Sequence, residues 1–468
     1  MLQAIPLVTM KPRTSRTMIF CCAPAMFSCF GQQPAVGMLL FLLTLPMLSA
    51  AAVRYVDNSG PPACSDSTGN GSATSPWCTV TYGVGHISSG DTLYVKSGTY
   101  NENLYISGPA GRASAPTVIQ ACPGGTVTLR GSGTNSDRVK IANTSYITFQ
   151  GFIITNYNQG LFIDNSNNII VRNCTVHDVG QEGIHPNSNS SYITIDSCTV
   201  FDTGVWRYNG EGIYIGGIGT NDNTSRVTVR NSTVYNTTDE GIELKPGTHD
   251  CLIDGNTIHH NNTVSNGYNG AAIEVDESTI TGESWPSNPS HVVRNNIIHD
   301  VGPGSGAALL NSGIRAGTGV TVYNNLIYNI NSAGYGILAD NNSSDTYTRG
   351  IYHNTVDLSS SRAVKVMGGA TDVRNNIGPA TSGNLAFSAS FFVNRTGGDY
   401  HLVAGSAPIN AGVDLRRVVP TDIAGVSRKA NGAPDDGAYE FVQGTGGIGS
   451  GSRTGGSSAV LVWRPVRR

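Results

Sequence analysis

Between Tyr146 and Ile377 the chain repeats one short pattern of hydrophobic and polar residues. Typical examples are Val171–Val176, Val229–Val234, Val293–Ile298 and Val322–Ile327. Alternation with a period of two is typical of a strand that buries one face. Turns rich in Asn, Gly, Ser and Asp separate these segments, and no helical periodicity intervenes. Strands this short cannot bury a face alone, so the pattern predicts an all-β solenoid of stacked coils.

Aligning the repeats places related residues at the same turn of successive coils. The column consists of Cys174, Cys198, Ser232, Asn256, Asn296, Asn325, Asn354 and Asn376. An inward asparagine in a turn can hydrogen-bond the coils above and below it, satisfying backbone groups that the turn leaves unpaired. This asparagine ladder indicates a β-helix rather than a propeller, whose blades repeat at longer and more regular intervals.

Further strand-like segments lie on both sides of the repeats. They are Val53–Asp57, Gly90–Val95, Gly98–Tyr100 and Pro116–Ile119 before them, and Tyr400–Val403, Ser406–Asn410, Asp422–Gly425 and Ala433–Glu440 after them. These segments resemble the first coils and the closing segment of the pectate-lyase-like superfamily. The resemblance covers roughly Val53 to Phe441. It implies a single-stranded right-handed parallel β-helix with loop insertions along one face, and it does not specify the substrate.

The N-terminus has the features of an export segment. Lys11, Arg13 and Arg16 precede a hydrophobic core at Met38–Met47 and small residues that end at Ala52. We expect residues 1–52 to be a secretory signal, 53–442 the β-helix and 443–468 a flexible Gly/Ser-rich tail. The mature protein is then secreted, extracellular or periplasmic, monomeric and without a membrane span. A net charge of −3 gives no electrostatic reason to expect nucleic acid as a partner.

The cysteines fit an exported protein. Of the nine, three lie in the leader and six remain, and an even number permits disulfides. Cys64 and Cys78 bracket a polar loop and are the candidate pair. The other four lie in strand-like patterns, where a cysteine is expected to act as a small buried hydrophobic residue.

Three glutamates, Glu182, Glu211 and Glu240, recur in one outward column at steps of 29 residues (211 − 182 and 240 − 211), each followed by Gly and Ile. Like charges one coil apart are unfavourable unless a bound cation, a basic neighbour or a shared proton compensates them. We interpret the column as a candidate metal site. The alternative is a solvated row screened by water and salt.

The residues that follow the same isoleucines also point outward, because side chains alternate along a strand. The residues two positions further on face the same way. Together these positions form a patch of carboxylates, Lys, Arg, His and Tyr, and such a patch is not needed on the surface of a purely structural solenoid. The candidate catalytic residues are His185, Tyr214, Glu243, Lys245, Asp276 and Arg315.

Long insertions flank these strands, and insertions in a solenoid concentrate on its functional face. Aromatic faces above a polar floor suit sugar rings, so we expect an extracellular polysaccharide as the partner. The predicted substrate contacts are Trp206, Arg207, Tyr208, Tyr268, Trp285 and, on the strand face, Glu274. The alternative is that the aromatic residues only hold their loops in place.

The segment Glu240–Lys245, followed by Cys251–Thr257, resembles the motif of the alginate lyase and chondroitinase B type. The resemblance implies that Glu240 helps to hold Ca²⁺ and that Lys245 is the catalytic base. The chain departs from that family at Asp276, which lies in the column where those enzymes have an Arg-His pair.

The reaction that this implies is β-elimination on a uronic-acid polymer. Ca²⁺ or Arg315 would neutralise the sugar carboxylate, Lys245 would remove the C5 proton, and Tyr214 or His185 would protonate the leaving oxygen. The carboxylates near Lys245 raise its pKa, so this reaction needs the metal to offset them. Epimerisation at C5 would use the same proton abstraction.

Two other classes of function stay open. Carboxylates one coil apart, such as Glu243 and Glu274, lie near the separation of the catalytic pair in retaining glycoside hydrolases. A non-catalytic β-helix that binds carbohydrate or mediates adhesion is the third possibility, since one fold hosts many functions.

Overall fold

The computed structural model describes residues 51–134, 137–206, 210–217, 222–261, 263, 270–276, 290–302, 311–317, 319–331, 333–340, 349–428 and 432–443. Within these ranges no helix is long and apolar enough to cross a membrane. The predicted export segment and tail lie almost wholly outside them, so both stay predictions.

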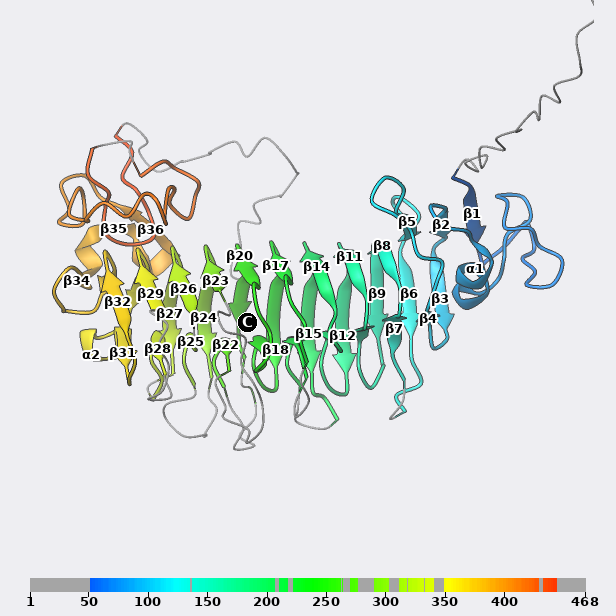
Figure 1. Ribbon diagram of the computed structural model, residues 1–468, viewed down its shortest axis with the longest axis horizontal. Helices are drawn as coiled ribbons and strands as arrows, with labels where there is room; N and C mark the ends of the chain where they lie inside the picture. Colours follow the sequence, from blue (N-terminus) through cyan, green and yellow to red (C-terminus); the bar gives the residue numbers. More distant parts are fainter. Residues whose placement is uncertain are drawn as a thin grey trace, which may run out of the picture. The chain divides into compact units, whose positions relative to one another are not determined.

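Nearly all described strands belong to three parallel sheets, A, B and C, which the chain visits in that order on each coil from β2 to β31 (Figure 1). Sheet A contains β1 (Val53–Val56), β2 (Thr92–Val95), β5 (Thr117–Ala121), β8 (Ser145–Gln150), β11 (Asn167–Arg172), β14 (Ser191–Asp196), β17 (Thr228–Arg230), β20 (Leu252–Asp254), β23 (His291–Arg294), β26 (Val320–Tyr323), β29 (Arg349–Tyr352) and β32 (Thr371–Arg374). Sheet B contains β3 (Gly98–Asn101), β6 (Val127–Arg130), β9 (Phe152–Thr155), β12 (Thr175–Val179), β15 (Thr199–Thr203), β18 (Thr233–Thr237), β21 (Thr257–His259), β24 (Ile297–Val301), β27 (Leu326–Ile330), β30 (Thr355–Asp357), β33 (Ile377–Gly378) and β34 (Leu385–Ala386). Sheet C contains β4 (Tyr105–Ile106), β7 (Val139–Ala142), β10 (Leu161–Asp164), β13 (Ile184–Asn187), β16 (Ile213–Ile215), β19 (Ile242–Leu244), β22 (Ile273–Val275), β25 (Ile314–Ala316), β28 (Ile337–Ala339) and β31 (Val364–Val366).

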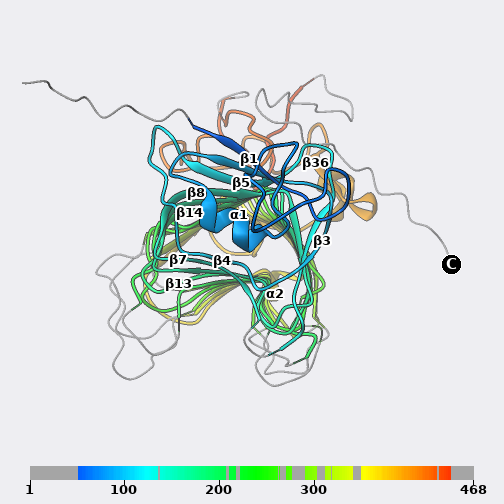
Figure 2. The same cartoon turned by 90° about the vertical axis from the view of Figure 1, so that its right-hand side faces the viewer.

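The stacking confirms the right-handed parallel β-helix predicted from the repeats. Figure 2 looks along the stack and shows the three sheets around one interior. The inward isoleucines of sheet C, among them Ile213, Ile242 and Ile273, have no exposed surface. Burying such a side chain contributes roughly 1.5–3 kcal/mol, and the gain recurs on every coil.

The asparagine ladder forms at the corner between sheets A and B, as predicted. The side-chain oxygen of Asn325 accepts hydrogen bonds from the backbone and side-chain nitrogens of Asn296, at 3.0 and 2.9 Å. The Asn325 amide in turn donates to Asn354 and to the carbonyl of Val293, at 2.9 and 3.0 Å. The residue before each ladder position has a positive φ, 56° at Asn324, a conformation that Asn tolerates better than most residues. This explains the recurring Asn-Asn pairs.

Substituting Asn325 with Ala is expected to lower the free energy of unfolding by about 3 kcal/mol or more. The change leaves buried donors on Asn296 and a buried acceptor on Val293 without their partners. Denaturant unfolding of Asn325→Ala measures the loss. Asn101→Ala, at an exposed strand position, is the control and should change stability by less than about 0.5 kcal/mol; equal losses in the two variants would contradict the ladder's role.

The two ends of the stack are closed differently. The predicted disulfide Cys64–Cys78 forms beside the short helix α1 (Val80–His86), which packs on the first coils. At the other end, Asn384 continues the ladder by accepting hydrogen bonds from Asn376. Beyond it the chain forms a closing segment with a small antiparallel sheet. Its elements are η1 (Ala389–Phe391), β35 (Phe392–Asn394), η2 (Arg395–Gly397) and β36 (Asp399–Leu402). A second short helix, α2 (Ser360–Ala363), lies between β30 and β31.

The buried ion pair of Arg428 and Glu440, at 2.7 Å, fixes this closing segment to the coils, because Arg428 also donates to Asn324. The remaining cysteines behave largely as predicted. Cys174, Cys198 and Cys251 are buried and Cys122 is half-buried.

The glycines of the Glu-Gly-Ile repeats are required by close packing between coils. A Cβ atom on Gly212 would lie 2.2 Å from a methyl of Val234 and 2.7 Å from the carbonyl oxygen of Gly241. Gly183 and Gly241 are equally confined. This stripe is therefore structural, and it holds the preceding glutamates in register along the edge of sheet C.

Candidate active site

The outer face of sheet C collects the predicted catalytic residues. Tyr214, Glu243, Glu274 and Arg315 are successive cross-strand partners on β16, β19, β22 and β25. His185 occupies the same position on β13, because Ile184 pairs with Ile213. The six candidate catalytic residues thus lie on consecutive coils of one face, as the alternation predicted.

These side chains point away from the coil interior, yet His185, Tyr214, Glu243 and Asp276 are buried, and Lys245 and Arg315 are half-buried. The nearby glutamates are buried as well. Glu240 and Glu243 expose 6% and 4% of their surface, and Glu211 exposes 9%. The alternative of a solvated, screened row is therefore wrong for Glu211 and Glu240. Glu182 is only half-buried.

A network of ion pairs crosses four coils, those of β19, β22, β25 and β28. The Lys245 ammonium lies 2.7 Å from Glu243 Oε1 and 3.0 Å from Asp276 Oδ2. Arg315 lies 2.5 Å from Glu274, 3.0 Å from Asp340 and 3.9 Å from Asp276. Lys245 is therefore held between carboxylates of its own coil and the next one, and Arg315 between carboxylates of the coils before and after it.

This network keeps Lys245 protonated. Burial alone would lower its pKa, but Glu243 and Asp276 outweigh burial and raise the pKa above its ordinary value. Lys245 also lies 5.6 Å from the centre of the Tyr214 ring, a cation–π contact that favours the ammonium form as well. The lysine can act as a base only if the charge on these carboxylates is offset.

The carboxylates form two overlapping groups that could hold a cation. In each group, three carboxylates offer oxygen atoms within 4.8 Å of one another, namely Glu211, Asp239 and Glu240 in one and Glu240, Glu243 and Glu274 in the other. Sequence reasoning predicted Glu211 and Glu240 as ligands and missed Asp239. Glu182, the third predicted ligand, belongs to neither group within the described part of the chain.

The two carboxylate groups contain more negative charge than the nearby Lys and Arg side chains neutralise. Burial, followed by repulsion from nearby carboxylates, raises the pKa of Glu211 and Glu240 well above the ordinary value. Burial and Glu274 raise the pKa of Glu243 to about 8, although Lys245 opposes the shift. Such shifts are expected where a cation would complete the site.

Two further observations fit a cation. Glu211 Oε2 is buried and has no hydrogen-bond partner among the described residues. A Cβ atom on Gly270 would lie 1.7 Å from Glu240 Oε1 and 2.4 Å from Glu274 Oε2, so a glycine at this position lets these two carboxylates of the second group lie close together. Carboxylate oxygens are the ligands that Ca²⁺ prefers, and this donor set fits Ca²⁺.

Tyr214 and His185 differ in the proton that each could donate. Burial lowers the pKa of His185, so its ring is neutral, and Nε2 lies 2.9 Å from the carbonyl oxygen of Gly216. Burial raises the pKa of the Tyr214 phenol, which keeps its proton. His185 packs edge-on against Tyr214, with ring centres 4.6 Å apart, and so helps to position it.

Among the predicted substrate contacts on the insertions, only Trp206 lies within the described residues. Arg207, Tyr208, Tyr268 and Trp285 lie outside them. Trp206 is 43% exposed and packs on the backbone of earlier coils, since a Cβ on Gly180 would lie 2.3 Å from its ring. This contact fits the alternative in which Trp206 holds its own loop.

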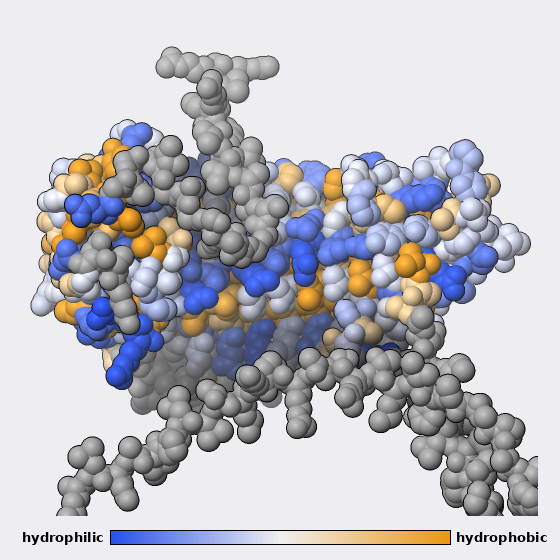
Figure 3. All heavy atoms as spheres, turned by 90° about the horizontal axis from the view of Figure 1, so that it is seen from above, coloured by the Kyte–Doolittle hydropathy of each residue, from blue (hydrophilic) through white to orange (hydrophobic). Residues whose placement is uncertain are grey.

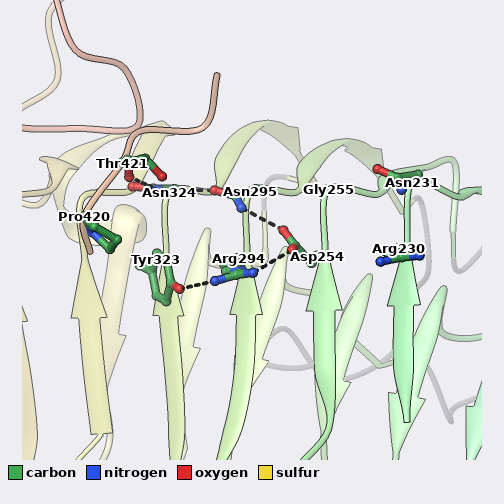
Figure 4. Close-up of a pocket in the computed structure, with 10 residues that line it drawn as sticks. All are labelled: Arg230, Asn231, Asp254, Gly255, Arg294, Asn295, Tyr323, Asn324, Pro420 and Thr421. Atoms are coloured by element: carbon green, nitrogen blue, oxygen red, sulfur yellow. Dashed lines mark hydrogen bonds and ion pairs between the residues drawn. The ribbon is translucent and has the colours of Figure 1, made fainter. Parts of the chain in front are cut away.

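A groove of about 330 Å³ lies elsewhere, where the closing segment meets sheet A (Figure 4). Arg294 lies on its floor and donates to Asp254 at 2.9 Å and to the Tyr323 hydroxyl at 2.8 Å. Asn324 on its rim donates to the carbonyl of Thr421 at 2.8 Å. Figure 3, seen from above, shows the hydrophilic row that crosses the coils on this side. These partners join coils to each other and to the closing segment. No residue that lines the groove belongs to sheet C, so the groove is separate from the candidate active site.

The fold and this outward, acidic site define a right-handed parallel β-helix of the pectate-lyase-like class. The chain belongs to the Pel9A-like right-handed β-helix family, whose model matches residues 62–343. No curated protein matches the chain.

Solved structures with this fold are similar at low sequence identity. Pectate lyase Pel9A is 17% identical, with a TM-score of 0.54, over 84% of this chain and 97% of its own. A rhamnogalacturonan lyase is 16% identical, with a TM-score of 0.53, over 73% and 91%. An alginate lyase from Paenibacillus sp. str. FPU-7 is 18% identical, with a TM-score of 0.50, over 66% and 96%.

Proposed function

We propose that the protein is a secreted, calcium-dependent lyase that cleaves an extracellular polyuronate by β-elimination. The observation that carries the proposal is that buried carboxylates able to hold a cation lie directly against Lys245 and near Arg315. Elimination next to a carboxylate needs a positive charge for the substrate's acid group and a base for the proton beside it.

The residues that would hold Ca²⁺ are Glu211, Asp239 and Glu240, with Glu243 and Glu274 beside them. Bound there, the ion would supply positive charge that acidifies the C5 proton and offsets the carboxylates around Lys245.

The chain's own residues then have distinct tasks. Arg315 orients the sugar carboxylate, and Lys245 Nζ takes the C5 proton. The electron pair of the C5–H bond forms the C4–C5 double bond, and the bond from C4 to the glycosidic oxygen breaks. Tyr214 donates its proton to that oxygen. C5 epimerisation shares the first step and differs in returning a proton to C5 instead of breaking the chain.

Three further observations support the proposal. The solved structures with this fold include, by name, an alginate lyase, a pectate lyase and a rhamnogalacturonan lyase. The export segment predicted for residues 1–52 and the Cys64–Cys78 disulfide agree with secretion. A polysaccharide outside the cell is the substrate that such a location offers.

A specific feature also favours glycoside hydrolysis as a second candidate. Glu243 and Glu274 are cross-strand partners with carboxylate oxygens within 4.8 Å, near the separation of about 5–5.5 Å in retaining enzymes. In this alternative Lys245 only neutralises its acidic neighbours.

The products distinguish these candidates. Purified protein is incubated with polygalacturonate, alginate and neutral glycans, with Ca²⁺ or with a chelator. The lyase predicts new ultraviolet-absorbing unsaturated ends on a polyuronate, which disappear in the chelator. New reducing ends without unsaturation indicate the hydrolase, and C5 inversion without new ends indicates the epimerase. Binding with none of these products contradicts an enzymatic function.

A further inference from the structure

The outer face of sheet C continues past the candidate active site toward the N-terminal coils. Tyr105, Lys140, Phe162 and His185 are successive cross-strand partners on β4, β7, β10 and β13. They occupy the same outward column as Tyr214 and Glu243, one coil of about 4.8 Å after another. We call Tyr105, Arg138, Lys140 and Phe162 the basic–aromatic platform.

Phe162 holds two cations in fixed positions on this platform. The Arg138 guanidinium carbon lies 5.1 Å from the centre of the Phe162 ring, and Lys140 Nζ lies 5.5 Å from it. Lys140 Nζ also lies 5.9 Å from the centre of the Tyr105 ring. Cation–π contacts of this length restrict the position of a cation without neutralising it.

One of the platform's two cations has no carboxylate partner. Asp164 forms an ion pair with Lys140 at 2.6 Å, whereas Arg138 forms none among the described residues. Lys140 keeps 27% of its side chain exposed, and Tyr105 is 50% exposed. An anionic ligand can therefore reach both the charge and an aromatic ring.

An unbroken row of side chains joins the platform to the site. Phe162 meets His185 with ring centres 4.8 Å apart, and His185 meets Tyr214 at 4.6 Å. Tyr214 in turn lies under Lys245. A polymer bound at Lys245 and extended along the coils toward the N-terminus runs over the platform.

We propose that the platform is a substrate subsite that binds the carboxylates of uronate units next to the reacting unit. This inference rests on the proposed function, which places the reacting unit of the polymer at Lys245. It adds to that function the residues that select an anionic polymer. Arg138 offers planar donors that match a carboxylate, Lys140 adds a second charge, and Tyr105 offers a ring on which a sugar can stack. A neutral polysaccharide gains little from these cations.

The test is the double variant Arg138→Gln and Lys140→Gln. Its affinity for uronate oligomers in Ca²⁺ is measured by calorimetry, and KM and kcat are measured on the polymer. We expect the affinity to fall about tenfold or more, as two charge-assisted contacts are lost. We expect KM to rise while kcat changes little, and the dependence of binding on salt to weaken.

A matched control is available on another face. Arg226 lies 5.2 Å from the centre of the Tyr192 ring and forms an ion pair with Asp250 at 3.2 Å, beside sheet A. Arg226→Gln removes a cation of the same kind and should leave affinity and KM unchanged. If the double variant does not fold, Arg138→Gln alone provides the test, with thermal unfolding as the check on its folding.

Binding and cleavage are scored separately, so the two proposals fail in different ways. Wild-type affinity and KM in the folded variant would overturn the platform, as would an equal loss on a neutral glycan. Tight binding of uronate oligomers that is weakened in the variant, but without unsaturated products, would uphold the platform and reject the lyase. If the wild-type protein binds no uronate oligomer, the platform proposal is rejected outright.

Discussion

Lys245→Arg is expected to lower the rate of elimination by about 10²- to 10⁴-fold, the range that general-base catalysis contributes. Arginine keeps the positive charge and can still pair with Glu243 and Asp276, so the fold should be preserved. Its guanidinium does not lose a proton in proteins, so it cannot accept one from the substrate. The rate of appearance of unsaturated ends is the measurement.

Comparing Lys245→Arg with Lys245→Ala separates the effect of losing the base from the effect of losing the positive charge. Lys245→Ala should abolish activity as well, and it should also destabilise the protein by about 3–5 kcal/mol, because two buried carboxylates lose their partner. Lys365→Arg, at an exposed position on β31 of the same sheet, should leave activity unchanged. Full activity in Lys245→Arg would show that another group is the base.

The second large effect concerns Ca²⁺ and stability. An ion that binds only the folded protein stabilises it by about 2.7 kcal/mol at a hundredfold excess over Kd. We expect the thermal midpoint of the wild-type protein to rise when Ca²⁺ replaces a chelator, with a smaller effect of Mg²⁺.

Glu240→Gln should change both the thermal midpoint in chelator and the rise of that midpoint with Ca²⁺. In chelator the variant is expected to unfold at a higher temperature than the wild type, because burial and neighbouring carboxylates disfavour the charge that it removes. Its response to Ca²⁺ should be largely lost. A calcium shift in Glu240→Gln as large as that of the wild type would argue against this carboxylate as a ligand.

The fold could be predicted because each coil repeats the same physical constraint. Period-two alternation identifies the buried face, and stacking in register then places residues of equal coil position in one column. The ladder from Cys174 to Asn376 and the outward column from His185 to Arg315 follow directly from these two rules. The contacts of Lys245 with Glu243 and Asp276 follow as well.

What the sequence did not reveal depends on turns and loops, which the strand alternation does not describe. Asp239 lies before the Glu-Gly-Ile segment, outside the strand alternation, although its position next to Glu240 was a usable signal. The burial of Glu211 and Glu240 depends on chain segments that periodicity does not describe. Trp206 packs on Gly180 of the preceding coil, and because Trp206 lies outside the strands, their alternation does not predict this contact.

The hydrogen bonds at the last rung have a consequence for the behaviour of the protein in solution. A stack of identical parallel strands presents, at its end, a row of unpaired amides and carbonyls that invites another chain to add on. Here Asn384 accepts the hydrogen bonds that Asn376 donates, and β34 pairs with the edge of β33. The ion pair of Arg428 with Glu440 anchors the segment that follows. The closing segment thereby opposes growth into fibres, a risk that any protein built from interchangeable rungs must control.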